Sequence, residues 1–231
     1  TRHGWIKKIA LDHFASIRRN GLIAIGLEAD DELCWVLSGD DKAQVIIGTS
    51  LGMAIRFPVS DLRPIGRTAR GVTSMKLRAG DTIVDFSIAP ADTNQDLLII
   101  TNDGFGKRTN ITEFRTQNRG GIGLISTKFK NQHSRVTNTC ICKEEDELMI
   151  VSANGVVVRL RAGDISRQSR TATGVRIQSM DDNDHVASVT KIVPIEEQER
   201  ITKEEVNKKP NASGSEPSAG TPNDLEQSTD S

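Results

Sequence analysis

Arginine side chains recur just before a glycine in four similar stretches of the chain, and their chemistry suits phosphate groups. A guanidinium can hold a phosphate through two parallel hydrogen bonds, and glycine lets a bulky partner approach the backbone closely. The arginines concerned are Arg18, Arg19, Arg63, Arg67, Arg70, Arg115, Arg119, Arg167 and Arg170. We predict that they form a row of sites that hold the backbone of bent duplex DNA without reading its bases.

A second set of basic residues stands four positions after an earlier glycine in each stretch. Lys8, Arg56, Arg108 and Arg159 hold this position, and the first three are included in the predicted DNA-binding set. The alternative is structural, since basic residues on a strand are mostly solvated and a following glycine often serves only a turn or a bulge. Recurrence in one register favours a function, although a repeat can also keep a residue for folding.

The residues that would indicate catalysis or a metal site are missing from the sequence. It contains no tyrosine, and it lacks a P-loop, a dinucleotide-binding fingerprint and a nucleophile elbow. The four histidines fall at unrelated places, and the three cysteines form no CxxC pair, which argues against zinc and against a disulfide framework. We predict no catalytic residue and no metal ligand.

Four glycines align the stretches as repeats, with spacings of 48, 52 and 51 residues. Around each glycine stand a hydroxyl residue three before, a basic residue four after, an acid eight or nine after, and a second glycine 17 or 19 after. The first glycines are Gly4, Gly52, Gly104 and Gly155, and the second glycines are Gly21, Gly71, Gly123 and Gly174. Such self-similarity indicates a repeat architecture. The acid is interpreted as structural, capping a turn or pairing with an arginine.

Each repeat is typical of four short strands. An apolar run such as Leu97–Ile100 leads into a tight turn at the first glycine, and the returning strand alternates apolar and polar residues. Two further strands follow, for example 72–77 and 82–88. Four strands in about 50 residues predict an all-β, propeller-like array of four-stranded blades. Aromatic residues are few, so aliphatic side chains must fill the core.

Charge and composition divide the chain into two parts. Residues 196–231 hold nine acids and four basic residues, which leaves 26 basic and 22 acidic residues in 1–195. We predict a β array over 1–194, with repeats near 1–43, 44–94, 95–146 and 147–194, and an acidic, mostly disordered tail over 195–231. The first repeat begins at its turn, so it is expected to lack a strand. No run is long enough for a membrane helix, and we expect no membrane partner.

The repeat, S/T-x-x-G-x-x-x-R/K followed by an acid and R-x-x-x-G, resembles that of the C-terminal domains of DNA gyrase and topoisomerase IV A subunits. The heptad Gln117, Asn118, Arg119, Gly120, Gly121, Ile122 and Gly123 is similar to the gyrase box, but Asn118 and Ile122 replace basic residues. The resemblance covers residues 1 to about 194. It implies a β-pinwheel whose blades exchange strands, and a basic rim that wraps DNA. In the family the domain usually has six blades, so the chain resembles a fragment covering the later ones.

The resemblance also implies partners and a role. Double-stranded DNA, the gyrase B subunit and a second gyrase A subunit are expected, with ATP and Mg²⁺ used by other parts of the complex and no cofactor in this chain. Family members cleave DNA through a tyrosine, so this chain is expected to act only as part of a type II topoisomerase. The alternatives are a topoisomerase IV domain and a propeller-type protein-interaction scaffold. The Ser/Pro/Asn-rich tail favours a chloroplast location, with the mitochondrion or the bacterial cytoplasm as alternatives.

Overall fold

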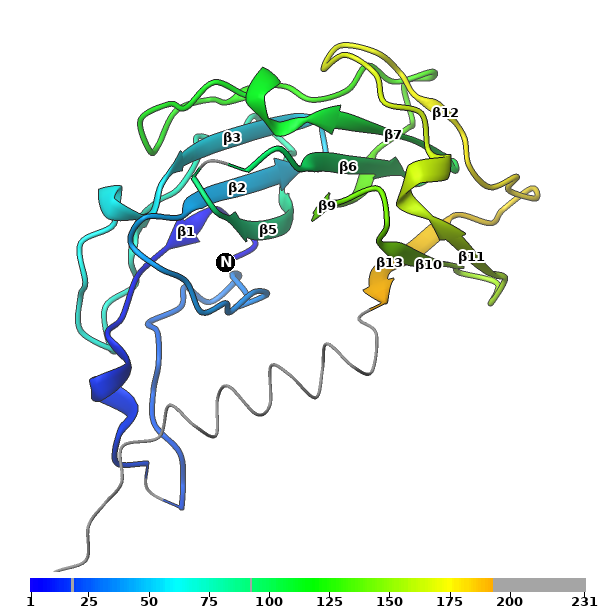
Figure 1. Cartoon of the computed structure of the whole chain (residues 1–231). Helices are drawn as coiled ribbons and strands as arrows, with labels where there is room; N and C mark the ends of the chain where they lie inside the picture. The colour runs from blue at the N-terminus through cyan, green and yellow to red at the C-terminus, as the bar shows by residue number, and fades with distance from the viewer. Residues whose placement is uncertain (18, 92, 193–231) are drawn as a thin grey trace, which may run out of the picture. The chain divides into compact units, whose positions relative to one another are not determined.

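A computed structural model describes residues 1–17, 19–91 and 93–192 of the chain (Figure 1). Residues Thr1–Ile192 form one compact unit. The predicted acidic tail and the candidate Arg18 lie outside the described residues.

Antiparallel hairpins centred on the first glycines are the main elements (Figure 1). The returning strand pairs with the apolar strand over its whole length, for example from Asp96↔Asn110 to Ile100↔Gly106. The left-handed φ of the turn glycines, +75° to +87°, explains why glycine stands there. The hairpins are β2 (Gln44–Thr49) with β3 (Met53–Pro58), β6 (Asp96–Thr101) with β7 (Phe105–Asn110), and β10 (Glu147–Ser152) with β11 (Val157–Arg161). The predicted all-β class is confirmed.

The hydroxyl residue three before each first glycine closes its turn. Its side-chain oxygen accepts the backbone amide of the residue just after the glycine, at 3.0–3.2 Å in all four repeats. The pairs are Thr1 with Trp5, Thr49 with Met53, Thr101 with Phe105, and Ser152 with Val156. The hydroxyl therefore satisfies an amide that the tight turn leaves without a backbone partner.

A third strand of each repeat pairs with the other edge of the apolar strand. These strands are β5 (Ile83–Ala89) beside β2, β9 (Val136–Cys142) beside β6, and β13 (Val186–Ile192) beside β10. In all three pairings the register shifts at the hydroxyl residue, so a bulge recurs at one place in the repeat. Strand β5 also packs against β9, and β9 against β13, which joins successive sheets.

The fourth strand of a sheet comes from the next repeat along the chain. These two-residue exchange strands are β4 (Val72–Thr73), β8 (Leu124–Ile125) and β12 (Val175–Arg176). Strand β4 pairs with β1 (Trp5–Ile6), β8 with β3, and β12 with β7. The strand exchange implied by the resemblance is therefore present, although the run predicted over 72–77 is a strand only in its first two residues.

Short 3₁₀ turns follow the hairpins: η1 (Leu11–Phe14), η2 (Val59–Asp61), η3 (Ile111–Glu113) and η4 (Ala162–Asp164). Within the described residues the only strand of the first repeat is β1, in a two-stranded sheet with β4. The first repeat was expected to lack one strand, and it has fewer strands than that expectation. Its apolar side chains Leu11, Ile17, Ile23 and Val36 are exposed.

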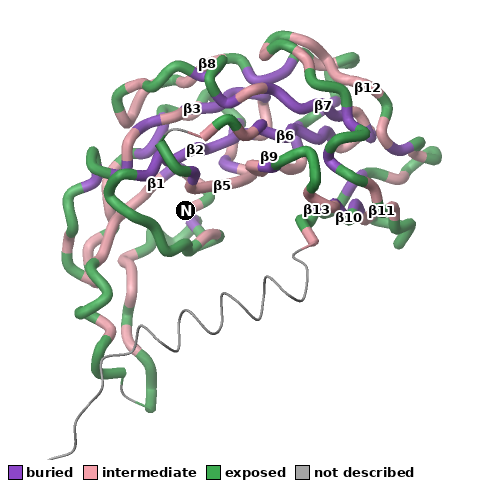
Figure 2. The backbone as a smooth tube through the Cα atoms, in the orientation of Figure 1, coloured by how far each residue is buried: buried purple, intermediate pink, exposed green. Residues whose placement is uncertain are grey.

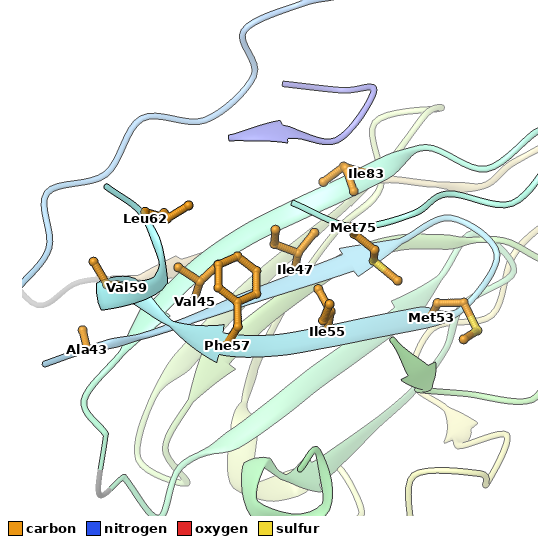
Figure 3. Close-up of a cluster of buried hydrophobic side chains, with 10 residues drawn as sticks. All are labelled: Ala43, Val45, Ile47, Met53, Ile55, Phe57, Val59, Leu62, Met75 and Ile83. Carbon is orange, nitrogen blue, oxygen red and sulfur yellow. The ribbon is translucent and has the colours of Figure 1, made fainter. Parts of the chain in front are cut away.

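The core consists of aliphatic clusters between and within the sheets (Figure 2). Figure 3 shows one of them, in which Val45 and Ile47 of β2 and Ile55 and Phe57 of β3 lie on the same side of the sheet beside Met75. Side chains two residues apart on a strand share a face, which is why these alternate positions are the apolar ones.

Candidate nucleic-acid interface

Each exchange strand is preceded by a loop that carries the predicted arginines, here called a rim loop. The rim loops are residues 63–70, 115–122 and 167–173. Near the start of each loop, an amide donates to the carbonyl of the basic residue that stands four positions after the first glycine of the preceding repeat. These bonds run from Ile65 to Lys8 at 3.0 Å, and from Gln117 to Arg56 and Gln168 to Arg108 at 2.8 Å. The rim loops are therefore attached to the preceding repeat at one end by the same bond.

The second glycine fixes the other end of each rim loop. Gly71, Gly123 and Gly174 have φ values of +112°, +81° and +97°. A Cβ at any of them would lie 2.6 Å from a carbonyl oxygen of the strand that follows the preceding repeat's first glycine, that of Ile6, Ala54 or Gly106 respectively. Because no side chain fits there, glycine is what allows the exchange strand to approach its partner.

One arginine in each rim loop binds the segment that follows the second glycine of the repeat before it; this segment is an exchange strand for Arg119 and Arg170. Arg67, Arg119 and Arg170 each precede the second glycine of their repeat by the same number of residues and are half-buried. In each, Nη1 donates to a carbonyl two residues past the preceding second glycine. The acceptors are Ile23 at 3.2 Å, Thr73 at 2.6 Å and Ile125 at 2.5 Å. These contacts place the three guanidiniums in equivalent positions, one per repeat.

Other predicted arginines are exposed. Arg19, Arg63 and Arg115 are exposed side chains, the latter two at the start of their rim loops. Arg70 is also exposed, but its guanidinium pairs with Glu28 and lies 3.7 Å from the ring centroid of Trp5. The guanidiniums of Arg63 and Arg115 can therefore contact a partner at the surface, whereas that of Arg70 already contacts Glu28 and Trp5.

The basic residues four positions after the first glycine serve the fold. Arg108 is 4% exposed and donates to the Ile165 carbonyl at 2.8 Å and to the Asp96 carboxylate at 2.9 Å. Arg56 donates to the Ile111 carbonyl at 3.2 Å, and burial lowers its pKa. Both side chains connect one repeat to the next; Arg108 is buried, whereas Arg56 is half-buried.

Two further predicted residues are held by carboxylates. Lys8 pairs with Asp41 at 2.7 Å, and only 20% of its side chain is exposed. Arg167 holds the buried Asp96 carboxylate through two nitrogens, with the shortest bond at 2.7 Å. Hydrogen bonding to Asp96 raises the pKa of Arg167. Asp96 is shared by Arg167 and Arg108, so one carboxylate faces two guanidiniums, and 45% of the Arg167 side chain stays exposed.

Lys107, a buried lysine that the sequence did not single out, binds the backbone of a rim loop. Lys107 is 0% exposed, and its ammonium donates to the carbonyls of Ser169 and Arg170 at 2.8 and 2.7 Å. Burial lowers its pKa to about 8, with Glu113 acting upward and Arg170 downward. Lys7, at the same repeat position, donates to rim-loop carbonyls including that of Ala69 at 2.8 Å. Their shared position, three after the first glycine, was the available signal.

Two exposed lysines were also missed. Lys76 and Lys128 stand five residues after a second glycine and are exposed. Their amides donate to the next rim loop, at the carbonyls of Gly121 (2.9 Å) and Ala172 (3.4 Å). They therefore lie next to a rim loop, and their equal register could have revealed them.

The box-like heptad 117–123 consists of the last six residues of the rim loop 115–122 and the second glycine, Gly123. Its backbone is bound on both sides, by Gln117 N to Arg56 O and by Gly120 N to Ser74 O, both at 2.8 Å. Gly120 and Gly123 have positive φ. Asn118 and Ile122 are exposed, so the surface of the heptad presents one arginine, Arg119, that is itself bound to a carbonyl.

The same residues offer no other kind of site. The described part of the chain has no group of three or more His, Cys, Asp or Glu side chains arranged to hold a metal. Nor does any helix in that part have the length and hydropathy needed to span a membrane.

Comparisons with known proteins bear on the same repeats. The family model described as DNA gyrase C-terminal domain, beta-propeller, matches residues 1–38, 43–90, 95–137 and 146–192. Each matched segment contains one of the four first glycines. The chain belongs to this family. The DNA gyrase A subunit of Synechocystis is 39% identical over 86% of the chain, and that of Staphylococcus aureus is 41% identical over 83%.

Two solved structures of C-terminal domains have a similar fold. A DNA gyrase A C-terminal domain superposes with a TM-score of 0.71 at 30% identity, over 83% of this chain and 64% of that one. The C-terminal domain of DNA topoisomerase IV gives 0.81 at 24% identity, over 89% and 64%. The chain spans only 27% and 22% of the Synechocystis and S. aureus proteins.

Proposed function

We propose that this chain is the DNA-binding and DNA-wrapping module of a DNA gyrase A subunit. Membership of the gyrase C-terminal domain family supports the proposal, and so does the row of equivalent rim loops. The observation that carries it is the recurrence of half-buried arginines, Arg67, Arg119 and Arg170, each oriented by the same bond to a carbonyl. The exposed Arg63, Arg115, Lys76 and Lys128 extend the positive charge beside them.

Such a row suits the phosphate backbone of a duplex. Each rim loop repeats the same geometry, so contacts recur at regular intervals along a bound helix without base recognition. Arginine held at one nitrogen keeps its other donors free while losing little further conformational entropy on binding. Affinity would then come mainly from the release of counterions, and would fall steeply with salt.

The chain contributes to topoisomerase activity without cleaving DNA itself. It contains no tyrosine to form a phosphotyrosine link. We propose that strand passage, ATP and Mg²⁺ belong to other parts of an assembly with the gyrase B subunit and a second gyrase A subunit. A topoisomerase IV domain is the second candidate, favoured by the likeness of fold to such a domain. ATP-dependent negative supercoiling of relaxed plasmid by the intact enzyme would distinguish gyrase from topoisomerase IV.

The test of DNA binding uses the exposed arginines that make no described ion pair. The variant Arg63→Ala with Arg115→Ala is compared with Arg78→Ala, an exposed arginine outside the rim loops. Affinity for a duplex is measured by fluorescence anisotropy across a range of salt. We expect the rim variant to lower the slope of log affinity against log salt by about 0.9 for each phosphate that it no longer neutralises.

The control should leave the slope unchanged. An unaltered affinity and slope in the rim variant would refute the proposed interface and favour a protein-interaction scaffold. The chloroplast location stays a prediction from composition. Imaging a fluorescent fusion of the full-length protein would test it.

A further inference from the structure

Lys107 of strand β7 binds the rim loop that precedes β12 from its buried side. Its ammonium donates to the carbonyls of Ser169 and Arg170, at 2.8 and 2.7 Å, and the residue has no exposed surface. Two positions further along the strand, the Thr109 hydroxyl donates to the Gln168 carbonyl at 3.0 Å. Three consecutive carbonyls of the loop therefore face β7, which lies next to β12 in the same sheet (Figure 1).

This orientation of the loop turns amide groups outward. The described peptide bonds are trans, so each N–H points away from the carbonyl of its own peptide bond. The amides of Ser169 and Thr171 share peptide bonds with the Gln168 and Arg170 carbonyls, and they donate no hydrogen bond to any described residue. Both residues are exposed. The loop therefore presents two free amides on either side of Arg170, an arrangement that favours an anion.

The fold does not require a charge at the position of Lys107. The residue three after the first glycine is Ile55 in the second repeat, where it is fully buried in an apolar cluster. Its side chain also lies under a rim loop, 3.5 Å from the place that a Cβ on Gly121 would take. Burial of an ammonium is costly, and it lowers the pKa of Lys107 to about 8. The charge therefore replaces an apolar residue that the same position accepts, which indicates a role for charge beneath this loop.

The charged groups around the ammonium act on it in opposite directions. After burial, which lowers the pKa of Lys107, the carboxylate of Glu113 raises this pKa and the guanidinium of Arg170 lowers it. Arg176 of β12 lies on the same side of β7, over an aromatic ring, whereas Arg108 points to the opposite side of the strand. Within the described structure the ammonium hydrogen-bonds only to neutral carbonyls, so an added negative charge at the loop would stabilise it.

We propose that Lys107 is a proton-linked positioning residue of this rim loop: a DNA phosphate bound over the loop keeps the ammonium protonated, and loss of the proton weakens DNA binding there. The proposal rests on the DNA-binding function proposed above. One layer of peptide separates phosphate from ammonium, so the two charges lie about 8 Å apart. At that distance, with an effective dielectric constant near 20 and screening by salt, the phosphate raises the pKa of the lysine by roughly one unit.

The direction of the pH dependence follows from this linkage. Free Lys107 loses its proton as pH rises through about 8, whereas Lys107 in the complex keeps it to a higher pH. DNA affinity is therefore greatest below about pH 8 and falls as pH rises toward the pKa of the complex. A neutral amine still has two N–H donors for the two carbonyls, so the loop keeps its hydrogen bonds and only the charge is lost.

The test compares the duplex affinity of the 231-residue chain with that of Lys107→Gln by fluorescence anisotropy, from about pH 7 to about pH 9.5 at one ionic strength. Glutamine can donate to the same carbonyls but carries no charge. We expect the wild type to bind roughly five- to tenfold more tightly than the variant at about pH 7, and about equally at about pH 9.5. Lys42→Gln removes an exposed charge outside the rim loops and should keep the wild-type pH profile.

Calorimetry of the wild type gives a second readout that needs no variant. Titration with duplex at about pH 8.5, in two buffers of different protonation enthalpy, should show uptake of about half a proton per chain. Binding without proton uptake would overturn the proposal. So would a Lys107→Gln variant that binds like the wild type at every pH, or more weakly by the same factor at every pH, because the lysine would then only hold the loop. Absence of binding by the wild type at every pH would refute the DNA-binding function itself, and the linkage with it.

Discussion

Replacement of the second glycine of the third repeat tests whether strand exchange requires a residue without a side chain. In Gly123→Ala the new Cβ lies 2.6 Å from the Ala54 oxygen, and φ is +81°. The left-handed conformation costs an alanine about 1–2 kcal/mol. The new Cβ also lies 2.7 Å from Cε of Met75, which can move, whereas the Ala54 backbone cannot move as easily; relief of the backbone overlap adds about 1–3 kcal/mol. The free energy of unfolding should therefore fall by roughly 2–5 kcal/mol.

Two other glycines separate these contributions. Gly80 has φ +72° with nothing within 4 Å, so Gly80→Ala should show the conformational cost alone. Gly66 also has open space and no left-handed φ, so Gly66→Ala should be neutral or stabilise by up to about 1 kcal/mol. The assay is urea unfolding followed by circular dichroism. If Gly123→Ala destabilises no more than Gly80→Ala, the close approach of β8 to β3 is not what requires glycine.

Two further predictions concern buried charges. Asp96→Asn should lower the free energy of unfolding by about 3 kcal/mol, because it leaves the Arg108 guanidinium buried beside a neutral group. Glu144 is an exposed partner of the same arginine, so Glu144→Gln should lower the free energy of unfolding by less than about 1 kcal/mol. Thermal unfolding compares them, and equal effects would contradict the assignment. Between about pH 8 and 10 the wild type should gain stability relative to Lys107→Met as pH rises, since the unfolded chain then binds the proton that folded Lys107 has released. Burial raises the pKa of Cys142 to about 12, so this thiol lowers stability as pH rises, but it does so equally in the wild type and in Lys107→Met. A difference in the free energy of unfolding between the two proteins that does not change with pH would refute the prediction.

The order of elements could be read from the sequence because its causes are local. Positive φ at Gly52 and Gly104, and the hydroxyl of Thr101 that accepts the Phe105 amide, are set within five residues. Apolar runs such as Leu97–Ile100 form strands for equally local reasons. The repeat period and the hairpins were therefore predictable.

The partners of the basic side chains were not predictable in this way. Arg108 and Arg115 stand at recurrent positions only seven residues apart, yet Arg108 is buried, with 4% of its surface accessible, and Arg115 lies exposed at the surface. The difference arises because the next repeat covers β7 and supplies the Ile165 carbonyl, 57 residues away, while Asp96 supplies the carboxylate. Contacts at that separation leave no periodic trace near Arg108 itself.

The sequence alone determined a four-fold β repeat with arginine before each second glycine, since turn geometry and strand alternation depend on neighbouring residues. Only the tertiary structure decided which basic residues face solvent. It also showed that the second glycine serves the contact between repeats, because its crowding comes from a strand some 65 to 70 residues earlier in the chain, as for Gly71 and Ile6. Burial and backbone approach are properties of the packed repeats, and a residue's own position in the sequence does not contain them.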